Sequence, residues 1–301
     1  KAAKSGQRVA VNLAGIGHDE VSRGMTLCTA DSLEPTQMFD TRVEVLASSA
    51  KPLRSRQRVR VHLGAAEVLA RVHVINKAGE IGPGSADLVQ LRLEAPVAAV
   101  MGEAFIIRSY SPQITIAGGI VIDPLPEKHR VRDTLPARAF LEGLIAASSD
   151  HRSVIGLLVK SAGAGGTDKR GLVDRTGWRV DVVADALALG KADDEIVEAG
   201  LHWVAASIFS ELKTAALGAL AEHHKRDPLS RGISRDILKE KMFRRGPQDV
   251  FKSVIAALET ENKLFVEHDI IRARSHSSEL SPGEQAFLDS VKTELAAASL
   301  A

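Results

Sequence analysis

The sequence is poor in cysteine, has few aromatic residues and carries almost no net charge. Its single cysteine, Cys28, excludes an internal disulfide and suits a reducing cytoplasm, which is the predicted location. No apolar run reaches the roughly 18 residues that a membrane-spanning helix needs, so no membrane partner is expected. A formal net charge of +1 excludes a uniformly cationic nucleic-acid binder, and any phosphate-binding surface must therefore be local. The start, KAAKSGQRVAV, has neither a methionine nor a signal peptide, which indicates a piece of a longer protein.

Motifs for catalysis and for metal binding are also missing. The glycine-rich stretch Ser161–Asp168 lacks the GK[ST] of a phosphate loop, and Asp168 replaces the third glycine of a dinucleotide fingerprint. We therefore predict a flexible turn there. His223 and His224 are adjacent, so they cannot both face one metal ion on a helix. Cys28 is predicted to be a barrel residue and His18–Glu20 a polar loop between strands, which leaves no catalytic, metal-binding or cofactor-binding residue to nominate.

The first half of the chain alternates apolar and polar residues with a period of two, as half-buried strands do. In residues 58–63, for example, Val59 and Val61 alternate with Arg58 and Arg60. Similar runs occupy residues 8–13, 41–46, 68–74, 89–94, 104–109 and 114–122, with glycine and proline between them. Short strands without intervening helices predict a closed antiparallel barrel. Gly118-Gly119 is expected to mark a bend or a close backbone approach.

From Pro136 onward the apolar period changes to that of helices. The first set of helices is predicted at residues 136–147, 153–162, 167–177 and 179–189, followed by a hairpin at 195–204. Thr167 is expected to be the N-cap of the third of these helices, and Gly177 to end it. The second set is predicted at residues 205–224, behind Ser234, and from Pro247 as first helical residue, with a hairpin at 263–274. A last helix at 282–298 would start behind Ser281. Because each set ends in a short hairpin, we predict tandem winged-helix units.

Positive charge gathers in two segments. Residues 51–73 contain one acid, Glu67, and six basic residues: Lys51, Arg54, Arg56, Arg58, Arg60 and Arg71. Residues 225–252 contain nine basic and four acidic residues. Such clusters either neutralise phosphates or keep the protein soluble. The RNA-binding candidates are Arg54, Arg56, Arg58, Arg60, Arg231, Arg235, Arg244 and Arg245. The helices that would enter a DNA major groove disfavour base readout. In the first unit this helix exposes Asp181 and Asp185, and in the second it has a mixed face of Gln248, Asp249, Lys252 and Glu259.

Several stretches resemble translational GTPases related to EF-Tu. GQRVAVNLAGI and SRGMTL (residues 6–16 and 22–27) resemble the end of the second domain of these proteins. PTQMFDTRVEVL, RVRVHLGAAEVLARV and LVQLRLEAPVAAVMGEAFIIRSYSP resemble their third-domain barrel. ITIAGGIVIDPLPEKHR is similar to the close of that barrel in one branch, the selenocysteine-specific elongation factors of the SelB type, and HHKRDPLSRGISRDIL resembles the entry to their second winged unit. The resemblance covers nearly the whole chain, and its specificity lies in the domain order.

The resemblance implies a fold of several domains, an EF-Tu-like antiparallel barrel followed by tandem winged-helix units. The implied domains are the tail of a second-domain barrel (1–32), the third-domain barrel (33–126), winged helix 1 (134–204), winged helix 2 (205–275) and the start of a further winged-helix unit (276–301).

The family delivers selenocysteinyl-tRNA to the ribosome at recoded UGA codons and uses GTP and Mg. Its far C-terminal winged helices bind a hairpin in the mRNA. This chain lacks a nucleotide-binding domain and those later units, so it is expected to bind no GTP or Mg itself, to perform no catalysis, and to supply a tRNA-side barrel and a linker toward the mRNA. The alternatives are a winged-helix DNA-binding transcriptional regulator with a barrel sensor and, less favoured, an enzyme.

Overall fold

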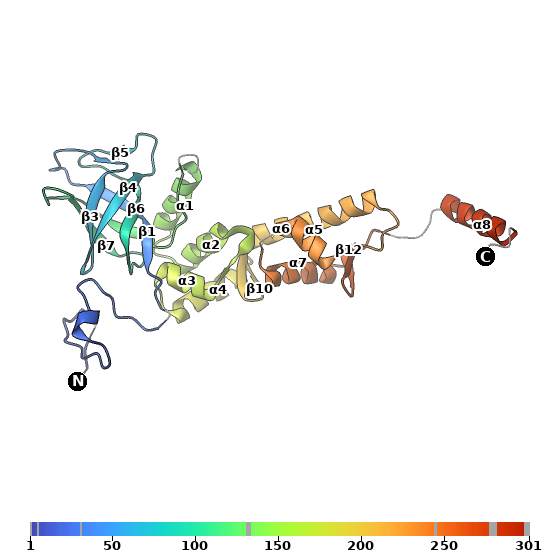
Figure 1. Ribbon diagram of the computed structural model, residues 1–301, viewed down its shortest axis with the longest axis horizontal. Coiled ribbons are helices and arrows are strands. Elements are labelled where there is room, and N and C mark those ends of the chain that lie inside the picture. The colour runs from blue at the N-terminus through green and yellow to red at the C-terminus, as the bar shows by residue number, and fades with distance from the viewer. Residues whose placement is uncertain are drawn as a thin grey trace. The chain divides into compact units, whose positions relative to one another are not determined.

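The computed structural model describes residues 2–4, 6–30, 32–130, 134–243, 246–276 and 282–297. The chain forms two compact units (Figure 1). One comprises Lys1–Ala146 with Val173–Arg179, and the other comprises Ala147–Leu172 with Val180–Ala301.

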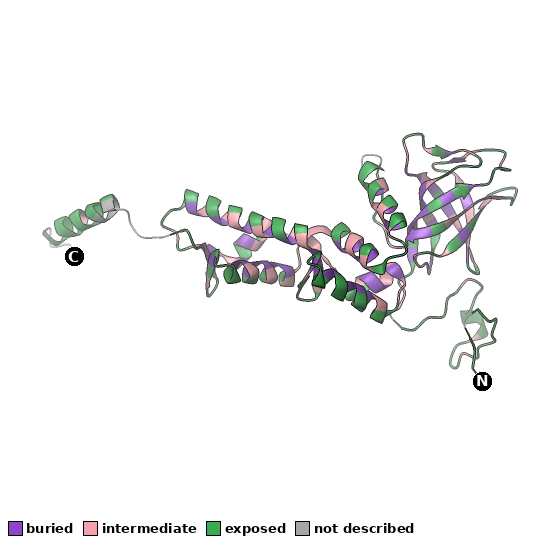
Figure 2. Cartoon of the chain, turned by 180° about the vertical axis from the view of Figure 1, so that it is seen from behind, coloured by how far each residue is buried: buried purple, intermediate pink, exposed green. Residues whose placement is uncertain are grey.

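The first unit contains a closed antiparallel barrel in the strand order β1-β6-β4-β3-β7-β8. Its strands are β1 (Thr36–Val45), β3 (Arg58–Leu63), β4 (Ala66–Val74), β6 (Ala86–Val97), β7 (Ala104–Ser109) and β8 (Thr115–Asp123). Two short strands, β2 (Leu53–Arg54) and β5 (Glu80–Ile81), pair separately, and helix α1 (Thr134–Ala146) belongs to the same unit. Alternate residues such as Val59, Val61 and Leu91 are buried and form the core. In Figure 2 the barrel strands accordingly carry the colour of buried residues along much of their length. The predicted barrel is confirmed.

The double glycine lies inside β8, which continues through it. A Cβ at Gly119 would lie 2.5 Å from the carbonyl oxygen of Arg42 and 2.7 Å from Cζ of Phe105, far inside contact distance. A Cβ at Gly118 would meet only the carbonyl oxygen of Phe105, at 3.3 Å. The expected close backbone approach is therefore found at Gly119, where the Phe105 ring fills the space that a side chain would need.

The prediction of a strand at residues 8–13 is wrong. Before β1 the described residues contain only a short 3₁₀ helix, η1 (His18–Glu20), and Val9, Val11 and Leu27 are exposed. Alternation makes a strand only where a neighbouring strand accepts its hydrogen bonds, and the described residues offer none here. Cys28 is likewise exposed and lies outside the barrel strands, contrary to prediction.

The first winged-helix region has the helices α2 (His151–Ser161), α3 (Lys169–Thr176) and α4 (Val180–Ala192). Its sheet has the order β10-β11-β9 and consists of β9 (Thr167–Asp168), β10 (Ile196–Ala199) and β11 (His202–Ala205). Thr167 is not the N-cap of α3, because it pairs with Trp203 in this sheet. Asp168 takes that role, and its carboxylate accepts the N–H of Gly171 at 2.7 Å.

The second winged-helix region repeats this order. Its elements are α5 (Ala206–Arg226), β12 (Ile233–Ser234), α6 (Arg235–Phe243), α7 (Gln248–Thr260), β13 (Leu264–Glu267) and β14 (Ile270–Ala273), with the sheet order β12-β14-β13. Pro247 occupies the N-cap position of α7 and not its first helical position. The last helix, α8, spans Pro282–Ala297, and Ser281 lies outside the described residues.

The hairpin of the first winged-helix region packs into the apolar core of the second. This core runs from Ala199 and Val204 of the first hairpin to Leu258 and Ile271 of the second region. At the same junction the Asp249 carboxylate accepts the N–H of Leu201 at 2.8 Å and lies 2.7 Å from Nδ1 of His202. Burial raises the pKa of Asp249, but these hydrogen bonds outweigh it and hold the pKa below its ordinary value. Asp249, expected on the exposed face of the third helix, instead joins the two regions.

Candidate RNA interface

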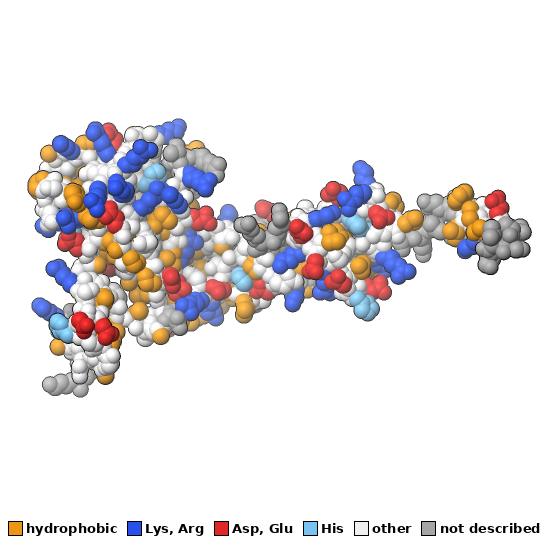
Figure 3. Space-filling model, in the orientation of Figure 1, with side chains coloured by type: hydrophobic (Ala, Val, Ile, Leu, Met, Phe, Trp, Pro, Cys, Tyr) orange, Lys and Arg blue, Asp and Glu red, His pale blue; other side chains and the backbone are white. Residues whose placement is uncertain are grey.

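One outer face of the barrel carries five arginines, which we call the arginine face: Arg58, Arg60, Arg71, Arg92 and Arg108. Arg58 and Arg60 point outward because β3 buries the residues between them. The strand register places Arg58 opposite Arg71 and Arg71 opposite Arg92, so three adjacent strands each supply one arginine to a single row. Arg60 is opposite Arg108 of β7. Lys and Arg side chains gather over the barrel in Figure 3.

Three of the predicted RNA-binding arginines are paired with carboxylates. Arg58 makes a bidentate contact with Glu94 at 2.8 and 2.5 Å. Arg60 contacts Glu67 at 2.7 Å, and Arg54 contacts Glu80 at 2.9 Å. The hydrogen bonds from Arg58 and Arg60 lower the pKa of Glu94 and of Glu67.

The residue count of the segment 51–73 therefore overstates its uncompensated positive charge. The fold brings Glu80 of β5 next to Arg54 and Glu94 of β6 next to Arg58. These exposed pairs contribute little stability. Their effect on the arginine face is to orient the guanidinium groups at the surface.

Arg56 and Arg71 have no carboxylate within ion-pair distance among the described residues, and both are exposed. Arg56 lies in the turn between β2 and β3 with φ of 70°, a left-handed conformation, and its N–H donates to the carbonyl of Val72 at 2.7 Å. This backbone bond fixes the turn. Arg56 and Arg71 can therefore contact a phosphate without giving up a carboxylate partner.

Tyr110 adds an aromatic ring to the arginine face. The Cζ atoms of Arg58 and Arg60 lie 4.8 and 5.5 Å from the centre of its ring, which remains 45% exposed. Guanidinium groups stacked on an accessible aromatic ring are common in nucleic-acid-binding surfaces. The RNA-binding candidates did not include Arg71, Arg92, Arg108 or Tyr110, although Arg71 was counted in the basic segment 51–73. The alternation in β6 and β7 contains the signal for Arg92 and Arg108, whereas Tyr110 follows β7 with no pattern of its own.

A buried polar cluster lies within the barrel unit. The side chains of Asp40 and Asp123 are fully buried. Nε2 of His129 lies 2.5 Å from the Asp40 carboxylate, and Arg175 of α3 donates to Asp123 at 3.0 and 2.6 Å. Gln90 donates to Asp40 at 3.0 Å. With their partners in place and no access to solvent, these carboxylates hold the chain segments together and are not placed to act on a substrate.

Protonation of this cluster is coupled. Burial raises the pKa of Asp40, and the bond to His129 offsets only part of that rise. Burial by itself lowers the pKa of His129, but the hydrogen bond to Asp40 and its charge outweigh this and leave the His129 pKa raised. Sequence reasoning missed the cluster because its members are far apart along the chain.

The second basic segment is only partly described. Arg231 is exposed in the loop before β12. Arg235 begins α6, its N–H donates to the carbonyl of Asp269 at 3.0 Å, and its buried Nε has no hydrogen-bond partner among the described residues. Arg244 and Arg245 lie outside the described residues. RNA binding by these four arginines therefore stays a prediction.

The glycine-rich turn does not fit a nucleotide phosphate. Residues Gly163–Gly165 form a 3₁₀ turn, and a Cβ on Gly166 would lie 2.8 Å from the carbonyl of Trp203. The turn is packed on β11, and the N–H of Gly171 in the next helix is already bound by Asp168. The turn is thus a packed connection between α2 and α3 and leaves no space for a nucleotide phosphate. The described residues also contain no group of three His, Cys, Asp or Glu side chains that could hold a metal ion.

None of the helices within the described ranges is long and apolar enough to span a bilayer.

Comparison with known proteins gives matches to both parts of the chain. The family model described as the beta-barrel domain of the selenocysteine-specific elongation factor matches residues 40–128. The model described as elongation factor SelB, winged helix, matches residues 217–272. The selenocysteine-specific elongation factor of Desulfomicrobium baculatum is 29% identical over 301 residues, which is 99% of this chain and 47% of that protein.

A solved structure supports the same fold. The crystal structure of the bacterial selenocysteine-specific elongation factor EF-Sec superposes with a TM-score of 0.61 at 16% identity, over 94% of this chain and 42% of the other. The chain thus spans about half the length of the relatives it matches. The resemblance inferred from the sequence and the predicted fold class are both confirmed.

Proposed function

Because the barrel and the winged-helix region belong to the selenocysteine-specific elongation factors, we propose that this chain is the part of such a factor that holds selenocysteinyl-tRNA and leads toward the mRNA. The proposed activity of the whole factor is GTP-dependent delivery of that tRNA to the ribosome at recoded UGA codons, in the cytoplasm. GTP hydrolysis is not assigned to this chain. The comparisons give no support to the transcriptional-regulator alternative.

The observation that carries the tRNA proposal is the arginine face with its exposed Tyr110. Guanidinium groups recognise phosphates through paired N–H donors, and Arg58 already presents such a pair to Glu94. A phosphate that replaces the Glu94 carboxylate would meet the same geometry. Arg56 and Arg71 add charge without exchanging a partner. The barrel is therefore suited to the backbone of a folded RNA and not to reading its bases.

The winged-helix regions would act as a spacer. The packing of the first hairpin into the core of the second region and the contacts of Asp249 with Leu201 and His202 hold the two regions together. A stiff connection of this kind would set the distance between a tRNA and an mRNA contact. Arg231, Arg235, Arg244 and Arg245 are proposed to touch RNA along the way.

Charge reversal on the arginine face tests the proposal. In the complete factor, Arg58→Glu with Arg60→Glu should weaken selenocysteinyl-tRNA binding at least tenfold. The salt dependence of the binding constant should also fall by a slope of about 2, close to 0.9 for each lost phosphate contact. Arg42→Glu is the matched control, because Arg42 is exposed on β1, three strands away from β3 in the closed barrel.

A second pair of variants separates phosphate binding from general charge. Glu67→Gln with Glu94→Gln removes the competing carboxylates and should tighten tRNA binding. If affinity is unchanged in both the reversed and the neutralised proteins, the arginine face does not hold the tRNA.

A further inference from the structure

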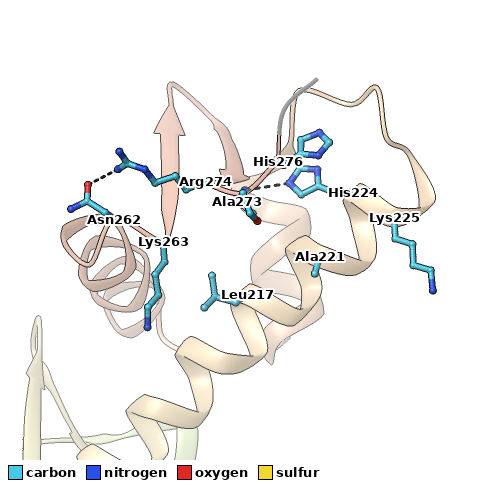
Figure 4. A pocket seen from close by; sticks show the side chains of 10 residues that line it. Leu217, Ala221, His224, Lys225, Asn262, Lys263, Ala273, Arg274 and His276 are labelled. Carbon is cyan, nitrogen blue, oxygen red and sulfur yellow. Dashed lines mark hydrogen bonds between the residues drawn. The ribbon is translucent and has the colours of Figure 1, made fainter. Parts of the chain in front are cut away.

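The second winged-helix region contains a hollow that the tRNA proposal does not use. It has a volume of about 720 Å³ and lies between α5 on one side and β14 with the turn before β13 on the other (Figure 4). Leu217 and Ala221 of α5 and Ala273 of β14 give it an apolar floor. An apolar floor in an open hollow is costly to leave in water, and it favours a flat apolar ligand group.

Three cations surround this floor: Lys225, Lys263 and Arg274. Arg274 is held by the Asn262 side-chain oxygen at 2.6 Å, and Lys263 lies 3.1 Å from Glu261. Lys213 also binds Glu261, at 2.6 Å, and the hydrogen bonds of both lysines lower the pKa of this carboxyl. Among the described residues that line the hollow none is acidic, so its rim is positive.

Flat rings stand beside these cations. The imidazoles of His224 and His276 are stacked, with ring centres 3.7 Å apart and planes 12° apart. His224 is buried, and its Nε2 accepts the N–H of Ala273 at 3.2 Å, which fixes the stack against β14 (Figure 4). Arg274 also lies 4.9 Å from the ring of Phe265, which is partly exposed.

We propose that this hollow binds single-stranded RNA. One base would extend the stack on the free face of His276, and the neighbouring phosphates would meet Lys225, Lys263 and Arg274. Alternation of cations and flat rings is the usual means of holding a single strand without reading its sequence. Along α5 the distance from Leu217 to Lys225 is about 12 Å, enough for roughly two nucleotides.

A duplex fits this hollow less well. Its bases are paired and stacked, so it would offer only phosphates and leave the floor and the imidazole stack uncovered. The site is also separate from the arginine face on the barrel, and the proposal therefore does not depend on tRNA binding there.

The experiment measures binding of a fluorescent ten-nucleotide single-stranded RNA to the whole chain by anisotropy. Lys225→Glu with Lys263→Glu should weaken binding at least tenfold and lower the salt slope by about 1.4, which is 0.7 for each phosphate contact. Both lysines are exposed, so these variants should fold. His276→Ala should weaken binding by about tenfold through loss of one stacked base. Lys252→Glu is the matched control, since Lys252 is exposed on α7 and does not line the hollow.

Competitors and crosslinking separate the other outcomes. Unlabelled single strand should compete better than a duplex of the same sequence or a poly-glutamate peptide, and a photoreactive uridine in the RNA should crosslink to residues 217–225 or 262–276. Equal competition by the duplex or the peptide would overturn the proposal. The proposal would also be overturned if the Arg58→Glu, Arg60→Glu protein lost binding of the single-stranded RNA while the Lys225→Glu, Lys263→Glu protein bound it normally. Failure of the tRNA test alone would leave this site unaffected.

Discussion

The ion pair between Arg175 and Asp123 should be one of the strongest single supports of the barrel unit. Asp123 is fully buried and receives two hydrogen bonds from the guanidinium, at 3.0 and 2.6 Å. Replacement by methionine, Arg175→Met, keeps an apolar stem against Phe140 but leaves a buried carboxylate with one remaining bond, from the N–H of Leu125 at 3.1 Å. Removing one partner of a buried pair costs about 3–5 kcal/mol.

Because Leu125 still donates to Asp123, we expect a loss near the lower end, about 3 kcal/mol in the free energy of unfolding. In a domain of this size that corresponds to a fall in melting temperature of roughly 6–12 °C. Urea unfolding followed by the fluorescence of Trp178, in a Trp203→Phe background, reports on the correct unit, because Trp178 groups with the barrel and Trp203 does not.

Two comparisons make the reasoning refutable. Arg71→Met removes an exposed arginine with no ion pair among the described residues, and it should change the free energy of unfolding by less than about 0.5 kcal/mol. Arg175→Met combined with Asp123→Leu removes both charges and should recover most of the loss. If Arg175→Met costs no more than Arg71→Met, the buried pair does not stabilise the fold as argued.

Further predictions concern His129, the double glycine and the junction of the winged regions. The folded-state pKa of His129 is raised, so its stabilising effect is fully present below the unfolded pKa of about 6.5 and is lost as pH rises through the folded value. The loss of stability in His129→Gln should therefore shrink between pH 6 and pH 9 in urea titrations, and a constant loss would contradict it. Gly119→Ala should destabilise the barrel by about 1–3 kcal/mol in the same titrations because of its 2.5 Å contact, and Gly118→Ala clearly less; equal effects would refute the packing argument. Asp249→Ala should speed hydrogen exchange at the amide of Leu201 at least tenfold, and unaltered exchange would show that the junction does not need this carboxylate.

Local patterns predicted the elements well wherever both partners of a contact were close in sequence. The alternation in residues 58–63 became β3, and the hairpins at residues 196–205 and 264–273 formed as expected, because a hairpin needs only its own two strands. The same alternation at residues 8–13 gave no strand, since the described residues provide no neighbour for it. Thr167 was mispredicted for the same reason. It is a residue type that commonly caps helices, but here it pairs with Trp203 in a sheet, and Asp168 caps α3 in its place.

The candidate RNA interface was likewise predicted from the sequence only in part. The sequence predicted a basic surface on β3, because alternation alone puts Arg58 and Arg60 on one face. Only the strand order placed Arg92 in the same row beyond Arg71, brought Arg108 opposite Arg60 and supplied Glu94 as a partner of Arg58. Residues outside the segment 51–73 therefore neutralise part of its positive charge.

By itself the sequence determined the two kinds of domain and their order, since hydrophobic period and the spacing of turns are properties of neighbouring residues. Tertiary structure alone decided the buried pairing of Asp123 with Arg175, the locking of Asp249 onto His202, and the hollow beneath His276. Each of these joins groups more than 40 residues apart, for example 52 residues for the first and 47 for the second. No local pattern records such distances, because they depend on how whole strands and helices pack.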